Sequence, residues 1–363
     1  MKTVEIAVIG GGPAGLSAAI NAASLGAKVA IIERDDQLGG QLRKQTHMFF
    51  GSKEQYASTR GVDIAVMLQE ELKKYQDNVD VYTDTTVLGL YEDGVLTIEQ
   101  SGKYMKLKPE RIIVATGASE KFLAFPNNDL PGIYGAGAVQ TLMNIYGVKP
   151  GNNVLMVGAG NIGLIVSYQL MQAGVNVKAI IDAAPRIGGY LVHASKVRRM
   201  GIPILTSHTV KYAYGKDSLE KVTIWQLDEQ WKPIPGTEKD FEVDVMCISV
   251  GLSPLAELLW QAGCKMVYVP ELGGHVPLRD ENMETSVKGI YIAGDVAGVE
   301  EASSAIVEGR LAGLCAAKSL GYANEDFEKM KQEYLQQLHS LRSGPVGEKI
   351  IKGLSKVTVQ GGI

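Results

Sequence analysis

The sequence predicts an α/β protein with two domains, because one glycine-rich pattern occurs twice along its 363 residues. In the first copy a short apolar strand runs into Gly10-Gly-Gly12-Pro-Ala-Gly15, and the next apolar strand ends at Glu33. In the second copy the corresponding segments are Gly158-Ala-Gly160-Asn-Ile-Gly163 and Asp182. Each copy has the order strand, tight turn, helix and strand, which is the unit from which doubly wound parallel sheets are built.

The first copy has the features of a dinucleotide-binding site. Its first Gly allows a tight turn, its second leaves room for a pyrophosphate, and its third lets the helix pack closely on the strand. The helix N-terminus offers unpaired N–H groups to the phosphates, and the acid at the end of the second strand accepts hydrogen bonds from a ribose. The residues that form this predicted site are Gly10, Gly12, Pro13, Ala14, Gly15 and Glu33.

The second copy predicts a site for NAD(H) or another adenine nucleotide. Asp182 would accept a hydrogen bond from an unmodified ribose 2′-hydroxyl and would repel a 2′-phosphate, so NAD is favoured over NADP. Arg186 lies close enough in sequence to reach a phosphate, which leaves NADP open, and an ADP or ATP moiety bound without redox chemistry also fits. The predicted site residues are Gly158, Gly160, Asn161, Ile162, Gly163 and Asp182.

The elements between and after the repeats follow from apolar periodicity and turn residues. A Pro- and Asn-rich stretch, residues 125–132, interrupts the pattern before the second repeat. Helices are expected over 62–75 and 302–320, and strands over 79–100, 104–107, 111–117, 241–250 and 289–295.

Composition excludes several classes of function. The net charge of −4 offers no basic surface for nucleic acid. Apolar runs are broken well before the roughly 18 residues that a membrane span needs. The first residues run directly into a strand, without the pattern of a signal peptide, and the three Cys are scattered, so a reducing, cytoplasmic location is expected. No Cys, His or carboxylate cluster has metal-ligand spacing, so no metal site is predicted.

Further motifs follow the first repeat in a fixed order: Ala115-Thr116-Gly117, Val250-Gly-Leu-Ser-Pro254 and Tyr291-Ile-Ala-Gly294-Asp295. With the glycine motif and Glu33, this set resembles the flavoproteins with two dinucleotide-binding domains, the thioredoxin-reductase and glutathione-reductase-like group. The resemblance implies two Rossmann-like three-layer domains, the second inserted into the first. The expected domains are an FAD-binding domain (1–119 and 252–322), an NAD(P)- or nucleotide-binding domain (120–251) and a helical C-terminal tail (323–363).

The same resemblance implies how FAD would be held. Asp295 would bind the ribityl chain of the flavin. The backbone at Glu301 and Ala302 would face the pyrimidine edge, where a positive helix end stabilises negative charge on the reduced ring. The other FAD-binding residues that it implies are Arg34, Gly40, Gln41, Thr116 and Gly117.

One feature of that group is missing from the sequence. Its disulfide reductases carry a redox-active Cys pair next to the flavin, whereas the segment Gln41–Phe50 contains no Cys. Cys247, Cys264 and Cys315 do not form such a pair either, so thiol–disulfide chemistry is not expected. His47, in the same segment, is a candidate for proton transfer near the flavin, and the alternative is a structural loop His.

A closer resemblance lies in the stretch Asp129–Asn144, which begins Asp-Leu-Pro-Gly-Ile-Tyr-Gly-Ala-Gly. It is similar to the FAD- and nucleotide-binding subunits of multi-subunit amine and imino-acid dehydrogenases, such as sarcosine oxidase alpha, hydrogen cyanide synthase, opine oxidase and dye-linked proline dehydrogenase. Many of these subunits have a Cys-rich iron–sulfur tail that this sequence lacks. Some have lost the third Gly of the second motif, which is present here as Gly163.

The resemblance therefore implies an FAD-dependent oxidoreductase that relays electrons for a partner subunit, or one that assembles as a homo-oligomer. Two alternatives stay open: a self-contained NAD(P)H-dependent flavin reductase and a nucleotide-bound scaffold without turnover. The tail carries an apolar stripe at helical spacing, which predicts that it packs on its own FAD domain or on a partner. The stripe consists of Phe327, Met330, Tyr334, Leu338 and Leu341.

Overall fold

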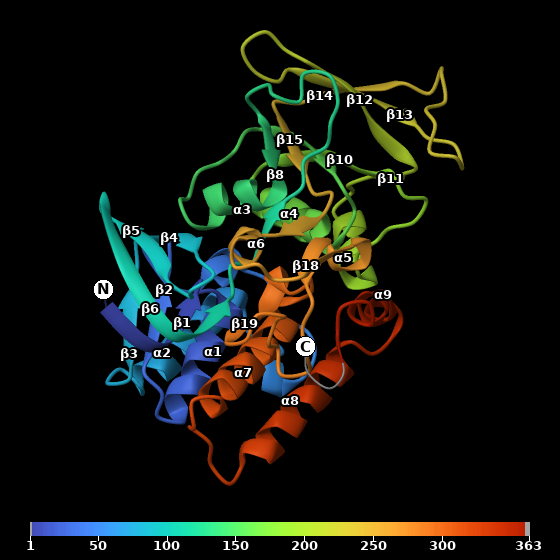
Figure 1. Ribbon diagram of the computed structural model, residues 1–363. Coiled ribbons are helices and arrows are strands. Elements are labelled where there is room, and N and C mark those ends of the chain that lie inside the picture. The colour runs from blue at the N-terminus through green and yellow to red at the C-terminus, as the bar shows by residue number, and fades with distance from the viewer. Residues whose placement is uncertain (1, 360–363) are drawn as a thin grey trace. The chain divides into compact units, whose positions relative to one another are not determined.

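The computed structural model describes residues 2–359 and divides them into two compact units (Figure 1). Unit 1 contains the residues up to Ser119 together with those from Ser253 onward, and unit 2 is Glu120–Leu252. The chain passes between the units through β7 (Ala118–Glu120) and β16 (Leu252–Pro254), which pair with each other. The α/β class with Rossmann-like sheets and C-terminal helices is confirmed, and the tail residues belong to unit 1.

Among the described residues, unit 1 is built on a seven-stranded sheet whose parallel part has the order β3-β2-β1-β6-β19. The long strand β6 pairs with β1, while its first half also pairs with β5 and its second half with β19. Strands β4, β5 and β6 form an antiparallel meander. The strands are β1 (Lys2–Ile9), β2 (Val29–Ile32), β3 (Val79–Tyr82), β4 (Thr85–Leu90), β5 (Leu96–Gln100), β6 (Lys103–Val114) and β19 (Ile290–Ile292).

Unit 2 repeats this arrangement with a change in chain order. Its five-stranded parallel sheet has the order β11-β10-β9-β15-β8, and a separate antiparallel meander is formed by β12, β13 and β14. The outer strand next to β15 comes first in unit 2, whereas the equivalent β19 of unit 1 comes last. The strands are β8 (Ile133–Gly135), β9 (Asn153–Val157), β10 (Asn176–Asp182), β11 (Ile204–Thr206), β12 (His208–Tyr214), β13 (Lys221–Gln226), β14 (Lys239–Glu242) and β15 (Val245–Ile248).

The unit 2 sheet is buried on both faces, as expected for parallel strands. Along β9, Val154 and Met156 pack into one apolar cluster, and Leu155 and Val157 pack into the other. The helices of this unit are α3 (Ala136–Asn144), α4 (Asn161–Gln172) and α5 (Leu191–Arg199).

Two predicted strand boundaries were wrong. Residues 104–107 and 111–114 belong to one strand, β6, because Pro109 stands within it without ending it. The single strand expected over 241–250 is instead split into β14 and β15. The break lies at Asp244, whose carboxylate accepts the backbone N–H groups of Asn152 and Asn153 at 2.7–3.1 Å, a contact that no strand pattern reveals.

Helices of unit 1 pack on one another with very little space between their backbones. A Cβ at Gly309 or Gly313 of α7 would lie 2.1 Å from the carbonyl oxygen of Ala14 or Ala18 of α1. Only glycine therefore allows α7 to cross α1 this closely. The helices are α1 (Pro13–Ser24), α2 (Gly61–Lys73), α6 (Glu257–Gln261), α7 (Ala302–Lys318), α8 (Phe327–Leu341) and α9 (Pro345–Leu354).

The tail packs on unit 1, with α8 beside α7 (Figure 1). Within the predicted stripe, Phe327, Tyr334 and Leu338 are buried in the core of the unit, and Met330 and Leu341 pack partly buried against it. The stripe thus covers its own unit. Helix α9, which the sequence pattern did not predict, packs on the short turn Pro270–Leu272 beside the hairpin of β17 (Met266–Val269) and β18 (Gly274–Pro277).

No helix within residues 2–359 combines the length and the apolar character that crossing a membrane requires. In the same residues, no group of three or more His, Cys, Asp or Glu side chains is arranged to hold a metal ion.

The close crossing of α1 and α7 gives a testable prediction. Gly313→Val forces branched carbons into the carbonyl of Ala18, so it should lower the free energy of unfolding by about 1–3 kcal/mol or more. Urea denaturation of the purified protein measures this change. Gly188→Ala is the matched control, because a Cβ there meets no atom within 4 Å and its φ is not left-handed. Equal urea midpoints for Gly313→Val and the wild type would contradict the packing argument.

Candidate functional site

The turn between β1 and α1 is built by glycines that no other residue could replace. Gly10 has φ of +102°, and a Cβ on it would lie 2.4 Å from the carbonyl oxygen of Ala115, the residue that follows the neighbouring strand β6. A Cβ on Gly15 would lie 1.8 Å from the carbonyl oxygen of Gly10. The helix N-terminus is therefore held directly against the ends of β1 and β6.

Glu33, at the end of β2, fixes the other side of this turn. Its carboxylate is buried and accepts the backbone N–H of Gly11 at 2.6 Å and that of Asp35 at 2.9 Å. A carboxylate has about four acceptor positions, so these two bonds leave capacity for the hydroxyl groups of a ribose.

The second copy makes the equivalent hydrogen bonds and the same close approaches of the backbone. Asp182, at the end of β10, accepts the N–H of Ala159 at 2.6 Å and that of Ala184 at 2.8 Å. Gly158 has φ of +111°, and a Cβ on it would lie 2.1 Å from the carbonyl oxygen of Ser249. A Cβ on Gly163 would lie 2.0 Å from the carbonyl oxygen of Gly158. The sequence repeat is thus a repeat of backbone geometry and hydrogen bonding.

The middle glycine of each motif faces open space. A Cβ on Gly12 would have its nearest neighbour, Gly40 Cα, 4.0 Å away, and a Cβ on Gly160 would meet nothing within 4 Å. Both α1 and α4 begin without a side-chain cap and without an acidic residue in the first turn. Each turn therefore presents a bare helix N-terminus beside an acceptor carboxylate, which fits the pyrophosphate and ribose of a dinucleotide.

Outside the three-glycine motif, one further glycine packs against each turn. A Cβ on Gly40, at the start of the 3₁₀ turn Gly40–Lys44, would lie 2.8 Å from Gly12 Cα, and a Cβ on Gly189 would lie 2.9 Å from the carbonyl carbon of Gly160. The side chain of Asn161 also accepts the N–H of Tyr190 at 2.8 Å. Beside the second site, Ile162 and Arg186 are both exposed.

The other predicted FAD residues lie around the turn of unit 1. Arg34 is exposed and pairs with Asp35 at 3.8 Å, and Gln41 is exposed in the 3₁₀ turn. The Thr116 hydroxyl donates to the carbonyl of Leu255 at 2.7 Å. Gly117 follows with φ of +76°.

His47 lies in the loop after the 3₁₀ turn, where its ring stacks on that of Phe49 with the centroids 6.0 Å apart. The carbonyl of His47 accepts the N–H of Gly61 at 3.3 Å, at the start of α2.

Asp295 lies in the 3₁₀ turn Gly294–Val296, directly after β19 and before α7. Burial raises the pKa of this carboxyl to about 7, and the nearby carboxylates of Glu308 and Glu300 add to the rise. The carboxylate accepts the N–H of Glu300 at 3.3 Å. Glu301 is the N-cap of α7, whose first turn contains Ala302 and no acidic residue.

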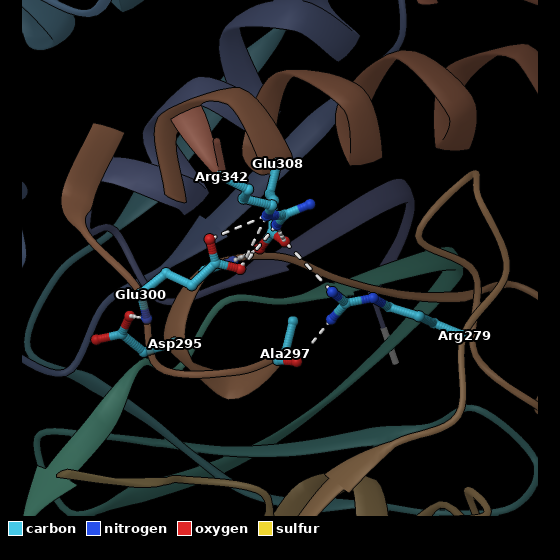
Figure 2. Close-up of polar contacts among 7 residues, drawn as sticks. Arg279, Asp295, Ala297, Glu300, Glu308 and Arg342 are labelled. Atoms are coloured by element: carbon cyan, nitrogen blue, oxygen red, sulfur yellow. Dashed lines mark hydrogen bonds and ion pairs between the residues drawn. The ribbon is translucent and has the colours of Figure 1, made fainter. Parts of the chain in front are cut away.

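A network of charges lies on one side of Asp295, beside Glu300, and the sequence offered no signal for it (Figure 2). It consists of Arg279, Glu300, Glu308 and Arg342, whose side chains are 12% exposed or less. These residues come from three separate parts of the chain, around Arg279, from Glu300 to Glu308, and at Arg342, so only the folded chain brings them together.

The three cysteines are separate buried thiols and form no disulfide. Burial raises the pKa of Cys247 and Cys264, and it raises that of Cys315 to about 12. Since the thiolate is the reactive form, all three are poor nucleophiles near neutral pH.

Several curated proteins are similar to this chain over most of its length. An opine oxidase subunit from Agrobacterium tumefaciens is 27% identical over 87% of this chain and 66% of its own length. The alpha subunit of sarcosine oxidase from a Corynebacterium species is 27% identical over 88% of this chain but only 33% of its own. The HcnB subunit of hydrogen cyanide synthase from Pseudomonas protegens is 24% identical over 98% of this chain and 80% of its own. The chain thus spans between one third and four fifths of these relatives.

Solved structures share the fold. L-proline dehydrogenase from P. horikoshii superimposes with a TM-score of 0.70 over 93% of this chain and 59% of its own, at 24% identity. T. acidophilum thioredoxin reductase superimposes with a TM-score of 0.72 over 88% of this chain and 99% of its own, at 23% identity.

The family model of the pyridine nucleotide-disulphide oxidoreductases matches residues 4–309, which include both glycine motifs, Glu33, Asp182 and Asp295. Members of this family generally bind FAD and NAD(P). The chain is therefore an FAD-dependent oxidoreductase that belongs to the pyridine nucleotide-disulphide oxidoreductase family.

Proposed function

We propose that this chain is an electron-transferring subunit of a multi-subunit amine or imino-acid dehydrogenase. The main observation behind this is that the glycine-rich turn occurs in both units, and that each turn has one carboxylate that can accept hydrogen bonds. The described residues contain no redox-active Cys pair. The relatives support the subunit role, because the similar opine oxidase, sarcosine oxidase and hydrogen cyanide synthase chains are all named as subunits.

In this proposal unit 1 holds FAD, which supplies the two-electron chemistry when it is bound. The turn at Gly12 and the start of α1 would bind the pyrophosphate, and Glu33 would bind the adenosine ribose. Asp295 would bind the ribityl chain. The N-terminus of α7 would face the pyrimidine edge of the flavin and stabilise negative charge there. Arg34, Gly40, Gln41, Thr116 and Gly117 would complete the site.

Unit 2 would hold a second adenine nucleotide on Gly158, Gly160, Asn161, Ile162, Gly163 and Asp182. A carboxylate at the position of Asp182 favours NAD over NADP, because it attracts a ribose hydroxyl and repels a 2′-phosphate. ADP or ATP would satisfy the same contacts.

The proposal excludes disulfide reduction. Such chemistry needs an exposed thiol pair of low pKa, whereas Cys247, Cys264 and Cys315 are buried thiols whose pKa values are raised. His47 is the candidate for proton transfer near the flavin, since it follows the 3₁₀ turn that packs on Gly12.

A second candidate function is a self-contained NAD(P)H-dependent flavin reductase. It is favoured by the complete geometry of the unit 2 turn, which keeps all three glycines and the acid. A scaffold that binds nucleotides without turnover is a third candidate, in which the unit 2 site is regulatory.

Removing the unit 1 acid tests the FAD site. Purified protein should be yellow, with about one FAD per chain, and Glu33→Ala should weaken FAD binding by about tenfold to a hundredfold through the lost ribose bonds. Fluorescence titration of the apoprotein with FAD measures this. Asp182→Ala is the matched control, because it removes the same contact from unit 2 and should leave FAD affinity unchanged. A colourless wild-type protein that takes up no added FAD would end the proposal.

A substitution in the unit 2 turn tests the second site. Gly160→Val should abolish binding of adenine nucleotides, because a branched side chain fills the open space at that position. Calorimetric titration of the wild type should give tighter binding of NADH than of NADPH. Gly12→Val, the matched control, should lose FAD and retain the nucleotide. Equal affinity of the wild type and Gly160→Val for NADH, ADP and ATP would rule the site out.

Purification from the native host separates the candidate functions. If the chain is a relay subunit, the tagged protein should copurify with a second flavoprotein, and an amine or imino acid should reduce its FAD only in that complex. An isolated chain whose flavin is bleached rapidly by NADH, without any partner, would support the self-contained reductase instead. Bound nucleotide without bleaching and without electron transfer in the complex would support the scaffold.

A further inference from the structure

A buried ion-pair network connects the C-terminal tail to the segment that carries Asp295 (Figure 2). Arg342 follows α8, and its Nε donates to both carboxylate oxygens of Glu300 at 3.2 and 3.0 Å. Its Nη2 donates to Glu300 Oε1 at 2.8 Å and to Glu308 Oε1 at 2.5 Å. One guanidinium thus joins the end of α8 to the segment before α7 and to α7 itself.

The same network holds the segment from its other end. Glu308 Oε2 accepts the backbone N–H of Gly294 at 3.0 Å, and Glu308 Oε1 lies 3.5 Å from Nη2 of Arg279. Arg279 Nη1 donates to the carbonyl of Ala297 at 2.6 Å. Residues 294–300 are therefore fixed at the start by Glu308, in the middle by Arg279 and at the end by Arg342.

The charges of the network balance. Arg279 and Arg342 compensate Glu300 and Glu308; Arg279 and Glu308 are buried, and Glu300 and Arg342 are nearly so. Asp295, on the segment that they hold, is a fifth ionisable group, which is partly buried and accepts the N–H of Glu300. Removing Arg342 would break the ion pair of Glu300 and leave Arg279 as the one arginine of the network against two carboxylates, so the segment could not keep this arrangement.

We infer that Arg342 is a positioning residue for the flavin. By holding Glu300 and Glu308 it fixes the segment Gly294–Glu301, so that Asp295 and the N-terminus of α7 are in place before FAD binds. The inference rests on the proposed binding of FAD in unit 1. Prearranged groups increase affinity because the ligand does not have to order them on binding. The tail thereby acts on the flavin site without contributing a group that touches the cofactor.

A purely structural role would give a different result, and the chain offers a matched control for it. Lys331 of α8 is also nearly buried and pairs with Glu281 at 2.7 Å, so it too fastens α8 to unit 1. This ion pair lies outside the segment 294–301 that Arg342 holds. Lys331→Met should lower thermal stability without changing FAD affinity more than about twofold.

The test compares Arg342→Met, Arg342→Lys and Lys331→Met as full-length apoproteins. Thermal unfolding reports stability, and fluorescence titration together with the visible circular dichroism of bound FAD reports the flavin site. Arg342→Met should weaken FAD binding by about tenfold to a hundredfold, the range for loss of the charge-assisted hydrogen bond that the displaced Asp295 would otherwise make to the ribityl chain, and should change the dichroism of the bound flavin. The FAD affinity of Arg342→Lys should lie between those of the wild type and Arg342→Met, because lysine keeps the charge but lacks the forked geometry of the guanidinium.

The double variant Glu300→Gln with Arg342→Met serves if Arg342→Met does not fold. It removes one charge of each sign and leaves the Arg279–Glu308 pair balanced. It should also bind FAD about tenfold or more weakly, and wild-type affinity and dichroism in a folded variant without Arg342 would overturn the inference. Equal losses of FAD affinity in Lys331→Met and Arg342→Met would overturn it too, because the loss would then follow from a general decrease in the stability of the protein. A wild-type protein that binds no FAD would instead refute the proposed function, and the inference with it.

Discussion

The structure of both units depends on one constraint, the near-contact between backbones where the first strand turns into the first helix. At Gly10 and Gly158 the chain passes so close to the neighbouring strand that a Cβ would lie within 2.4 Å of a carbonyl oxygen. This closeness points the helix N-terminus at the carboxyl ends of the strands, and it brings the acid of the second strand within hydrogen-bond distance of the turn. Each unit therefore has a positive helix end and an acceptor carboxylate at the same edge of its sheet.

The two units differ in what is built onto this shared frame. Unit 2 contains the turn with its parallel sheet, a separate antiparallel meander and the helices α3, α4 and α5. In unit 1 the later part of the chain adds β19, the Asp295 turn and α7, and α7 can approach α1 only because Gly309 and Gly313 have no side chains. The tail then covers α7 and places Arg342 among buried carboxylates. The additions to unit 1 therefore gather at the end of the sheet where the proposed flavin site lies.

Sequence reasoning recovered the fold class and the family because these depend on short-range patterns. Within each repeat the sterically required glycines, the apolar strands and the acid lie close together in sequence, and the family followed from short motifs that occur in a fixed order along the chain. It failed where contacts join distant segments. Nothing in the sequence pairs Arg342 with Glu300 and Glu308, and Asp244 splits an apolar stretch by bonding to amides 91 and 92 positions away. The roles of His47, Asp295 and the second nucleotide site remain predictions, because they depend on ligands.

The interrupted course of unit 1 has a consequence for the order in which the protein folds during synthesis. Strand β19 pairs with the second half of β6, yet it is synthesised only after all of unit 2. Unit 2 is continuous in sequence and can complete its sheet as it emerges, whereas the half-made sheet of unit 1 exposes the edge of β6 in the meantime. Nascent chains that end before Gly289 should therefore contain all of unit 2 and an incomplete unit 1 sheet, whose open edge favours aggregation and chaperone binding.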